Sequence, residues 1–330
     1  MTKKERVRAA LGGEEVDRPP VSMWGHDPPR EWQPEHLVAS TVEAYRAGGW
    51  DFIKLNPRAS YFGEAWGNHY EASRDNQRPE LVDAVVKDVA DLDAVAPVDA
   101  FAGVFGEHLQ AVAMLVEEVG DEADIIHTVF SPLGVLGNLC GEQRRFQQLA
   151  WEDPASAHAA LAALTETLDE YAEAALERGA AGIFYAPLQW ATHDQAREAF
   201  YREFGRPYDL QILSGLRDAE FNVLHVCGDR NMLEMLLDYP VAAFNWADRG
   251  EGNPNLQEIR GRVPAAVIGG IDHQRLPTMS EEELAGQVGD ALSGGFERLM
   301  IGPGCSIPPE TSPERRAAVG RLVRELSAAG

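Results

Sequence analysis

The sequence has few cysteines, few basic residues and no long apolar run, and each shortage excludes a class of protein. Three cysteines in 330 residues do not build the paired disulfide framework of a secreted domain, so we expect a reducing, cytoplasmic environment. Only 29 lysines and arginines stand against 53 aspartates and glutamates, and the net charge of -24 disfavours nucleic acids and anionic lipids as partners. No segment approaches the roughly 18 apolar residues of a membrane span, and no apolar leader follows Met1, so neither insertion nor export is expected.

Several common functional motifs are missing as well. No G-x-G-x-x-G turn follows the first strand-like segment, and no Walker A motif occurs, so the commonest nucleotide-binding folds have no support. No G-x-S-x-G elbow marks a nucleophilic serine, which leaves a hydrolase triad without support. The thiols are therefore better explained as metal ligands than as nucleophiles.

Short apolar segments alternate with helical patterns along the chain, as expected for parallel βα units. Eight segments are typical of strands: 20–24, 51–55, 124–130, 182–186, 221–226, 241–246, 265–269 and 298–301. Helices are predicted over 155–178, after a start signal at Asp153, over a stretch capped by Ser280 and Glu283, and over 313–329.

Eight such units in one chain of this length predict a (β/α)₈ TIM barrel, with an open doubly wound sheet as the alternative. No linker or repeat divides the chain, so residues 1–330 are expected to form one domain with extra N-terminal helices. Two longer connections, 56–123 and 194–218, are expected to hold extra helices or a short hairpin.

Three soft metal-ligand side chains follow predicted strands. Because side chains alternate along a strand, His225 and Cys227 point to the same side, as two ligands of one ion must. Cys305 follows the last predicted strand, and the loops after all strands of a barrel open onto one face. A His-Cys-Cys set with one open position is typical of catalytic zinc, while Cys140 is expected to be an ordinary core residue.

Other polar side chains lie near the predicted strand ends. Asp248, or Glu251 beside it, is a candidate to complete or modulate the metal shell. Surface loops and turns also carry such residues, so a structural role stays open for each of them. The candidates for substrate contact are His26, Tyr185, Gln189, Asn245, Asp272 and His273.

Six segments spread over nearly the whole chain share a known pattern. They are residues 4–7, 17–21, 51–54, 130–132, 224–228 and 302–305. Together they resemble the uroporphyrinogen decarboxylase superfamily, which implies a TIM barrel. That superfamily holds metal-independent decarboxylases and zinc methyltransferases that serve corrinoid proteins or coenzyme M, with cobalamin-independent methionine synthase as a more distant relative.

The resemblance favours the methyltransferase branch. The decarboxylases bind an octa-anionic porphyrinogen with an R-Q-A-G-R segment and a following aspartate, whereas this chain keeps only Arg30 in that segment and has Asn56 near the aspartate position. The methyltransferases carry H-x-C and a late G-C, which match here at His225, Cys227 and Cys305. Residues 270–273 depart from the G-N-x-D-P form of both branches, so the substrate stays open.

The sequence thus indicates a cytoplasmic zinc methyltransferase that moves a methyl group between a corrinoid, or another donor, and a thiol or corrinoid acceptor. Its expected partners are a small-molecule substrate and a small corrinoid-binding protein. The alternatives are a metal-independent uroporphyrinogen decarboxylase-type carboxy-lyase and a barrel that binds a corrinoid or tetrapyrrole, or a structural zinc, without catalysis.

Overall fold

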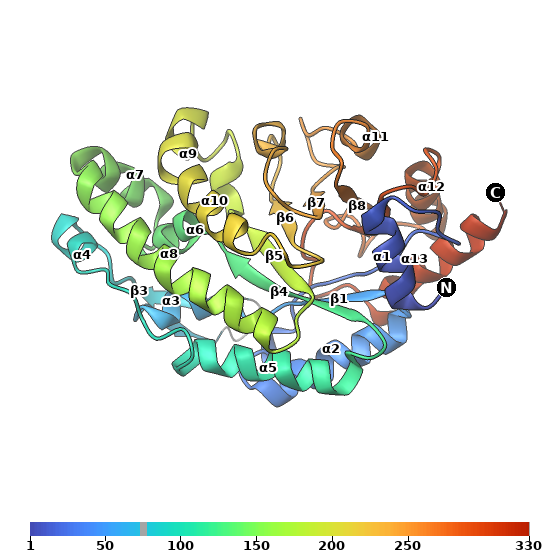
Figure 1. Cartoon of the computed structure of the whole chain (residues 1–330), viewed down its shortest axis with the longest axis horizontal. Helices are drawn as coiled ribbons and strands as arrows, with labels where there is room; N and C mark the ends of the chain where they lie inside the picture. Colours follow the sequence, from blue (N-terminus) through green and yellow to red (C-terminus); the bar gives the residue numbers. More distant parts are fainter. Residues whose placement is uncertain (73–77, 330) are drawn as a thin grey trace.

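Seven parallel strands form one curled sheet in the computed structural model, which describes residues 1–72 and 78–329 (Figure 1). Their order in the sheet follows the chain: β1 (Phe52–Leu55), β4 (Asp124–Phe130), β5 (Gly182–Ala186), β6 (Val223–Val226), β7 (Ala243–Trp246), β8 (Ala266–Ile271) and β9 (Leu299–Pro303). All seven lie within or next to the predicted strand segments, and their ends differ from the prediction by at most two residues. The (β/α)₈-type barrel predicted from the sequence is confirmed.

The first predicted strand, 20–24, is much shorter than expected. Val21 makes a single parallel bridge with Ile301 of β9, and its carbonyl accepts a hydrogen bond from the Asp51 N–H at 2.8 Å, just before β1. Pro19 and Pro20 have no N–H to donate, so a longer ladder cannot form on this side. The segment nevertheless closes the sheet between β9 and β1.

Helices surround the sheet (Figure 1). They are α1 (Lys3–Gly12), α2 (Pro34–Gly48), α3 (Tyr61–Ala65), α4 (Val89–Asp93), α5 (Gly103–Val119), α6 (Pro132–Leu139), α7 (Gln143–Glu152), α8 (Pro154–Glu177), α9 (Glu198–Phe204), α10 (Arg206–Gly215), α11 (Leu256–Arg260), α12 (Glu281–Leu292) and α13 (Pro313–Ala329). The predicted start signals are confirmed, because Asp153 caps α8 and Ser280 forms a capping box with Glu283 on α12.

The connections differ from a simple repeat in three places. The long first connection holds a hairpin of β2 (His69–Glu71) and β3 (Glu80–Asp83) as well as α3, α4 and α5, and the second long connection holds α9 and α10, both as expected. Between β6 and β7, however, the expected helix is only a 3₁₀ turn, η3 (Leu233–Leu236).

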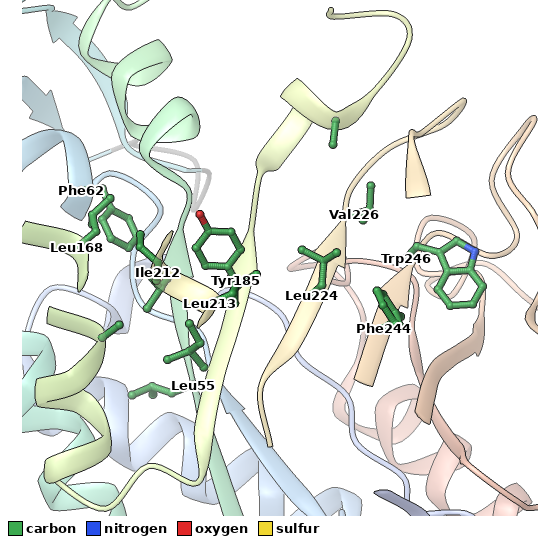
Figure 2. Close-up of a cluster of buried hydrophobic side chains, with 14 of the residues drawn as sticks. Leu55, Phe62, Leu168, Tyr185, Ile212, Leu213, Leu224, Val226, Phe244 and Trp246 are labelled. Atoms are coloured by element: carbon green, nitrogen blue, oxygen red, sulfur yellow. The ribbon is translucent and has the colours of Figure 1, made fainter. Parts of the chain in front are cut away.

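The apolar side chains form two clusters, one outside and one inside the barrel. The outer cluster joins the sheet to the helices, and Figure 2 shows Leu224 and Phe244 of the strands beside Tyr185, with Ile212 and Leu213 of α10. The inner cluster includes Phe52, Phe184, Ile268 and Met300 from alternate strand positions and Val7, Ala9 and Ala10 from α1.

The helix α1 closes the N-terminal end of the barrel. Its Arg6 binds Asp51 at 2.7 Å and its Lys4 lies 3.4 Å from Asp124, two carboxylates at the starts of β1 and β4. The opposite, C-terminal end carries the loops after the strands, where active sites of such barrels lie. In the described part of the chain, no helix has the length and apolarity needed to cross a membrane.

Two histidines are buried between β4 and the helices. His127 of β4 contacts the Tyr171 hydroxyl at 2.6 Å, and His108 of α5 packs against the Tyr61 ring. His108 Nε2 and His127 Nδ1 have no hydrogen-bond partner among the described residues. Burial lowers the pKa of His127 to about 3 and holds the pKa of His108 well below its usual value.

Both histidines are expected to make the fold acid-sensitive. The unfolded chain takes up a proton near pH 6.5, whereas folded His127 stays neutral until about pH 3, so a falling pH favours the unfolded state. Each such histidine contributes a loss of about 1.4 kcal/mol per pH unit in this window. The free energy of unfolding, measured with urea between pH 6.5 and 4.5, should therefore fall less steeply with falling pH for His127→Leu than for the wild type. An identical slope for the variant and the wild type would contradict this, and exposed His36→Gln is the matched control.

Candidate metal centre

His225, Cys227 and Cys305 come together at the C-terminal end of the barrel. One ligand atom of each lies within 4.8 Å of the others, and no other such group of His, Cys, Asp and Glu occurs among the described residues. His225 lies on β6 and Cys227 directly follows that strand, while Cys305 follows β9. The period of two along β6 and the closure of the barrel thus bring the three predicted side chains to one place.

The two cysteines have the spacing of a shared metal site. Their Sγ atoms are 3.6 Å apart, and two thiolates bound at about 2.3 Å to one tetrahedral ion lie about 3.8 Å apart. A disulfide needs about 2.05 Å, and both cysteines are free. The donor set of one imidazole and two thiolates fits Zn²⁺ and leaves one tetrahedral position without a protein ligand.

The thiols also form a polarised pair. Cys227 and Cys305 share a hydrogen bond, which lowers the pKa of Cys305 and raises the pKa of Cys227. The neighbouring His225 further lowers the pKa of Cys305. A thiolate is the form of cysteine that binds a metal, and the neighbouring imidazole favours that form in this pair.

Asn245 fixes the orientation of the His225 ring. The two residues are register partners on β6 and β7, and His225 Nδ1 lies 2.6 Å from Asn245 Oδ1. The Asn245 amide nitrogen donates to the carbonyls of Ile268 and Pro303 at 2.9 and 3.1 Å, so its oxygen must face the imidazole. Since an oxygen only accepts, Nδ1 carries the proton and Nε2 keeps its lone pair for a metal. Asn245 thus supports the ligand rather than the predicted substrate contact.

Gly304 allows Cys305 to approach the loop after β7. A Cβ at this position would lie 2.7 Å from the Ala247 Cα, which is closer than a side chain tolerates. The last strand loop therefore packs directly on the β7 loop, and this close packing holds Cys305 next to Cys227.

Asp248 lies behind the cluster rather than in it. Its carboxylate accepts the Gly270 N–H at 3.0 Å and lies 3.6 Å from Arg249, and burial raises its pKa to about 6. Glu251 points to solvent and binds Arg230 at 3.2 Å. Neither carboxylate belongs to the group of three donors within 4.8 Å.

Two of the residues expected to contact substrate are not part of the cluster: Tyr185 is turned out of the barrel, which corrects that prediction, and Gln189 lies on the turn after β5. Tyr185 faces the helices, as Figure 2 shows, and its hydroxyl donates to buried Asp209 at 2.7 Å. It follows Phe184, which faces the barrel interior, so the alternation of the strand turns Tyr185 outward. Gln189 lies on the exposed turn η2 (Leu188–Ala191), next to Gln143 at 3.4 Å.

The remaining three candidates lie on two cavities at the barrel mouth. Asp272 and His273 line a small cavity of about 150 Å³ beside Gly304, where the Asp272 carboxylate also caps the following turn. His26 lines a cavity of about 620 Å³, and its Nδ1 lies 2.9 Å from buried Glu31. These three side chains are thus placed where a substrate has access.

Lys54 is the site residue that the sequence analysis missed. It occupies an inward position of β1, two residues after Phe52, and its ammonium lies 4.7 Å from the centre of the Phe184 ring. His225 stacks on the same ring with 4.9 Å between the centres. A lysine between apolar residues of a buried strand was the available signal.

Comparisons with known proteins show the family to which the chain belongs. The model of the uroporphyrinogen decarboxylase (URO-D) family matches residues 28–326. The chain belongs to this family. This URO-D chain is similar to the methylcobamide:CoM methyltransferase MtbA of Methanosarcina mazei. The two sequences are 25% identical, and the match covers 98% of this chain and 98% of the relative.

Two further relatives show how far this URO-D protein resembles each branch. A solved structure of a methyltransferase from Methanosarcina mazei matches this chain with a TM-score of 0.84 at 24% sequence identity. The match covers 98% of this chain and 99% of that chain, so the two proteins share one fold. A uroporphyrinogen decarboxylase of Pseudomonas fluorescens is 27% identical, but over only 74% of this chain and 70% of its own length. The URO-D protein is thus an enzyme of the methyltransferase branch.

Proposed function

We propose that this enzyme transfers a methyl group between a corrinoid and a thiol, and that His225, Cys227 and Cys305 hold one zinc ion for the reaction. The observation that carries the proposal is the group of three soft donors within 4.8 Å at the C-terminal end of the barrel. Similarity to a methylcobamide:CoM methyltransferase supports a corrinoid as the other substrate, and a small corrinoid-binding protein as the partner that presents it.

The protein groups have distinct roles in this proposal. When bound, Zn²⁺ lowers the pKa of a coordinated thiol, so that the thiol is a nucleophilic thiolate at neutral pH. His225 is fixed by Asn245 with Nε2 available, and the two cysteines supply the negative charge that retains a divalent ion. Buried Asp248 supports the site indirectly, through the backbone of Gly270 near the end of β8.

The proposed reaction is tested by following methyl transfer from methylcobalamin to 2-mercaptoethanesulfonate in absorbance. The zinc-loaded enzyme should catalyse the transfer, and removal of the metal with a chelator should slow it by more than about 100-fold, because metal activation supplies several kcal/mol. Added zinc should restore the rate. A rate that is the same with and without chelator would contradict the proposal.

The decarboxylase alternative has weaker structural support. The cavity beside the mouth contains Arg30 from the segment that binds propionates in the decarboxylases, but Arg30 already pairs with Asp27 at 2.7 Å and Glu43 at 2.8 Å. A substrate with eight carboxylates needs free cations. Chelator-insensitive decarboxylation of uroporphyrinogen by the purified enzyme would favour this alternative over methyl transfer.

A further inference from the structure

Two strand loops determine where the cysteines of the candidate metal centre lie. The β6 loop, residues 227–231, begins with Cys227. The β7 loop, residues 247–253, begins with Ala247, and a Cβ on the glycine before Cys305 would lie only 2.7 Å from the Ala247 Cα. Cys305 is thus held against the β7 loop, so the separation of the two thiols depends on how the β6 and β7 loops are joined.

Asn253 joins the β6 loop to the β7 loop with all the polar groups of its side chain. Its amide nitrogen donates to the Gly228 carbonyl at 2.9 Å, directly after Cys227, and to the Ala247 carbonyl at 2.8 Å. Its amide oxygen accepts the Asn231 N–H at 2.9 Å. The reversed amide would place its oxygen against two carbonyls and its nitrogen against an N–H, so the orientation is fixed. One side chain therefore binds three backbone groups on the two loops.

Two further hydrogen bonds run between the same loops. The Arg230 N–H donates to the Glu251 carbonyl at 2.8 Å, and the Glu251 N–H donates to the Asp229 carboxylate at 3.1 Å. Gly252, with a φ of +71°, permits the close approach, since a Cβ there would lie 2.9 Å from the Arg230 side chain. The bond to Asp229 is exposed to water, whereas those of Asn253 are partly buried. Water competes less for partly buried groups, so Asn253 is the main link between the loops.

The link made by Asn253 is independent of the thiols, because it runs between backbone groups. It therefore holds the loops in the same way before and after an ion binds. A site that already has its shape loses less conformational freedom when its ligand arrives. The Sγ atoms of Cys227 and Cys305 are 3.6 Å apart, close to the separation of about 3.8 Å for two thiolates on one tetrahedral ion. This spacing is the geometry that the link preserves.

We propose that Asn253 is a positioning residue that sets the separation of Cys227 and Cys305 for the metal. The inference rests on the proposed function, because it concerns the same zinc site. Asn253 acts through the backbone of Gly228 and Ala247, not by contact with the ion. Its loss should therefore weaken metal binding while all three proposed ligands remain in the chain.

Replacing Asn253 by aspartate tests this role at nearly constant shape. The aspartate keeps an acceptor for the Asn231 N–H but loses both donors and turns a carboxylate toward two carbonyls. Zinc affinity, measured on the full-length protein by competition with a chromophoric chelator, should fall about 10-fold to 100-fold. The variant loaded with Co²⁺ should show a weaker thiolate-to-cobalt absorption band. Asn253→Ala removes all three bonds without adding a charge and should change both measurements in the same direction.

Hydrogen exchange of the zinc-free protein reports the link without any metal. The Arg230 N–H donates to the β7 loop but not to Asn253, so its exchange rate shows whether the loops stay joined. It should exchange faster in Asn253→Asp than in the wild type. Asn255 is the matched control, because it lies two residues further along and caps α11 through a capping box with Glu258. Asn255→Ala should lower the melting temperature and keep the zinc affinity of the wild type.

The outcomes separate the positioning role from the proposed function. An Asn253→Asp protein that binds zinc as tightly as the wild type would overturn the positioning role, whether or not its loops exchange faster, and would leave the proposed function intact. Equal losses of zinc affinity in Asn253→Asp and Asn255→Ala would also overturn it, since Asn253 would then be only structural. A wild-type protein that binds no zinc would overturn both proposals.

Discussion

Replacing Cys305 by serine is expected to remove zinc from the purified protein, from about one ion per chain to less than about a tenth of an ion. Loss of a residue that only orients a ligand already weakens metal binding 10-fold to 100-fold, so loss of a ligand should exceed that range. The serine hydroxyl is a hard, protonated donor and does not replace a thiolate beside Cys227. Methyl transfer should fall by more than about 100-fold with the metal.

The third cysteine provides the matched control. Cys140 is fully buried in the outer cluster, and burial raises the pKa of its thiol to about 12. Cys140→Ala should keep one zinc per chain and lose only some stability, as small core truncations do. Metal analysis by mass spectrometry checks both variants. A Cys305→Ser protein that retains a full zinc ion would show that the cluster of three donors is not the metal site.

Replacing Asn245 by leucine is expected to weaken zinc binding by about 10-fold to 100-fold while all three proposed ligands stay in place. The leucine has a similar volume but accepts no hydrogen bond, so the proton of His225 is no longer held on Nδ1. Part of the population then has its proton on Nε2, the nitrogen that a metal needs unprotonated. Competition with a chromophoric chelator measures the affinity, and ¹⁵N NMR of the zinc-free protein reports the tautomer of His225.

A second buried asparagine separates this effect from general destabilisation. Asn222 precedes β6 at the opposite end of the same barrel, where its amide bonds the backbone of Ile183 and Leu216. Asn222→Leu should cost stability and keep the zinc affinity of the wild type. If both variants lose zinc to the same extent, or if Asn245→Leu changes neither the affinity nor the tautomer, Asn245 has no role in positioning His225.

The sequence predicted the features that follow from strand periodicity and barrel closure. The alternation along residues 223–227 placed His225 and Cys227 on one side, and the common face of the strand loops placed Cys305 beside them although it lies 78 positions further along the chain. The same alternation, applied to Phe184, already turns Tyr185 outward toward Asp209. That prediction was wrong because nearness to a strand end was weighed above the direction of the side chain.

Other features depend on distances that no periodicity supplies. The role of Asn245 follows from two carbonyls, on β8 and at the end of β9, that turn its amide. The sequence signal for Lys54 was only its place between apolar strand residues, whereas the assembled barrel shows that its ammonium is buried against Asn56 and forms no ion pair among the described residues. The short pairing of Val21 did have a signal in the sequence, because Pro19 and Pro20 have no N–H to donate to a neighbouring strand.

Zinc K-edge X-ray absorption of the purified enzyme tests the central claim most directly, because it counts the sulfur atoms around the metal. The protein alone should show two sulfur scatterers at about 2.3 Å, from Cys227 and Cys305, and nitrogen or oxygen at about 2.0 Å. After addition of a thiol substrate, the sulfur count should rise from about two to about three, as the open position fills. A count that stays at two, or a zinc already enclosed by four protein ligands, would contradict thiol activation at this centre.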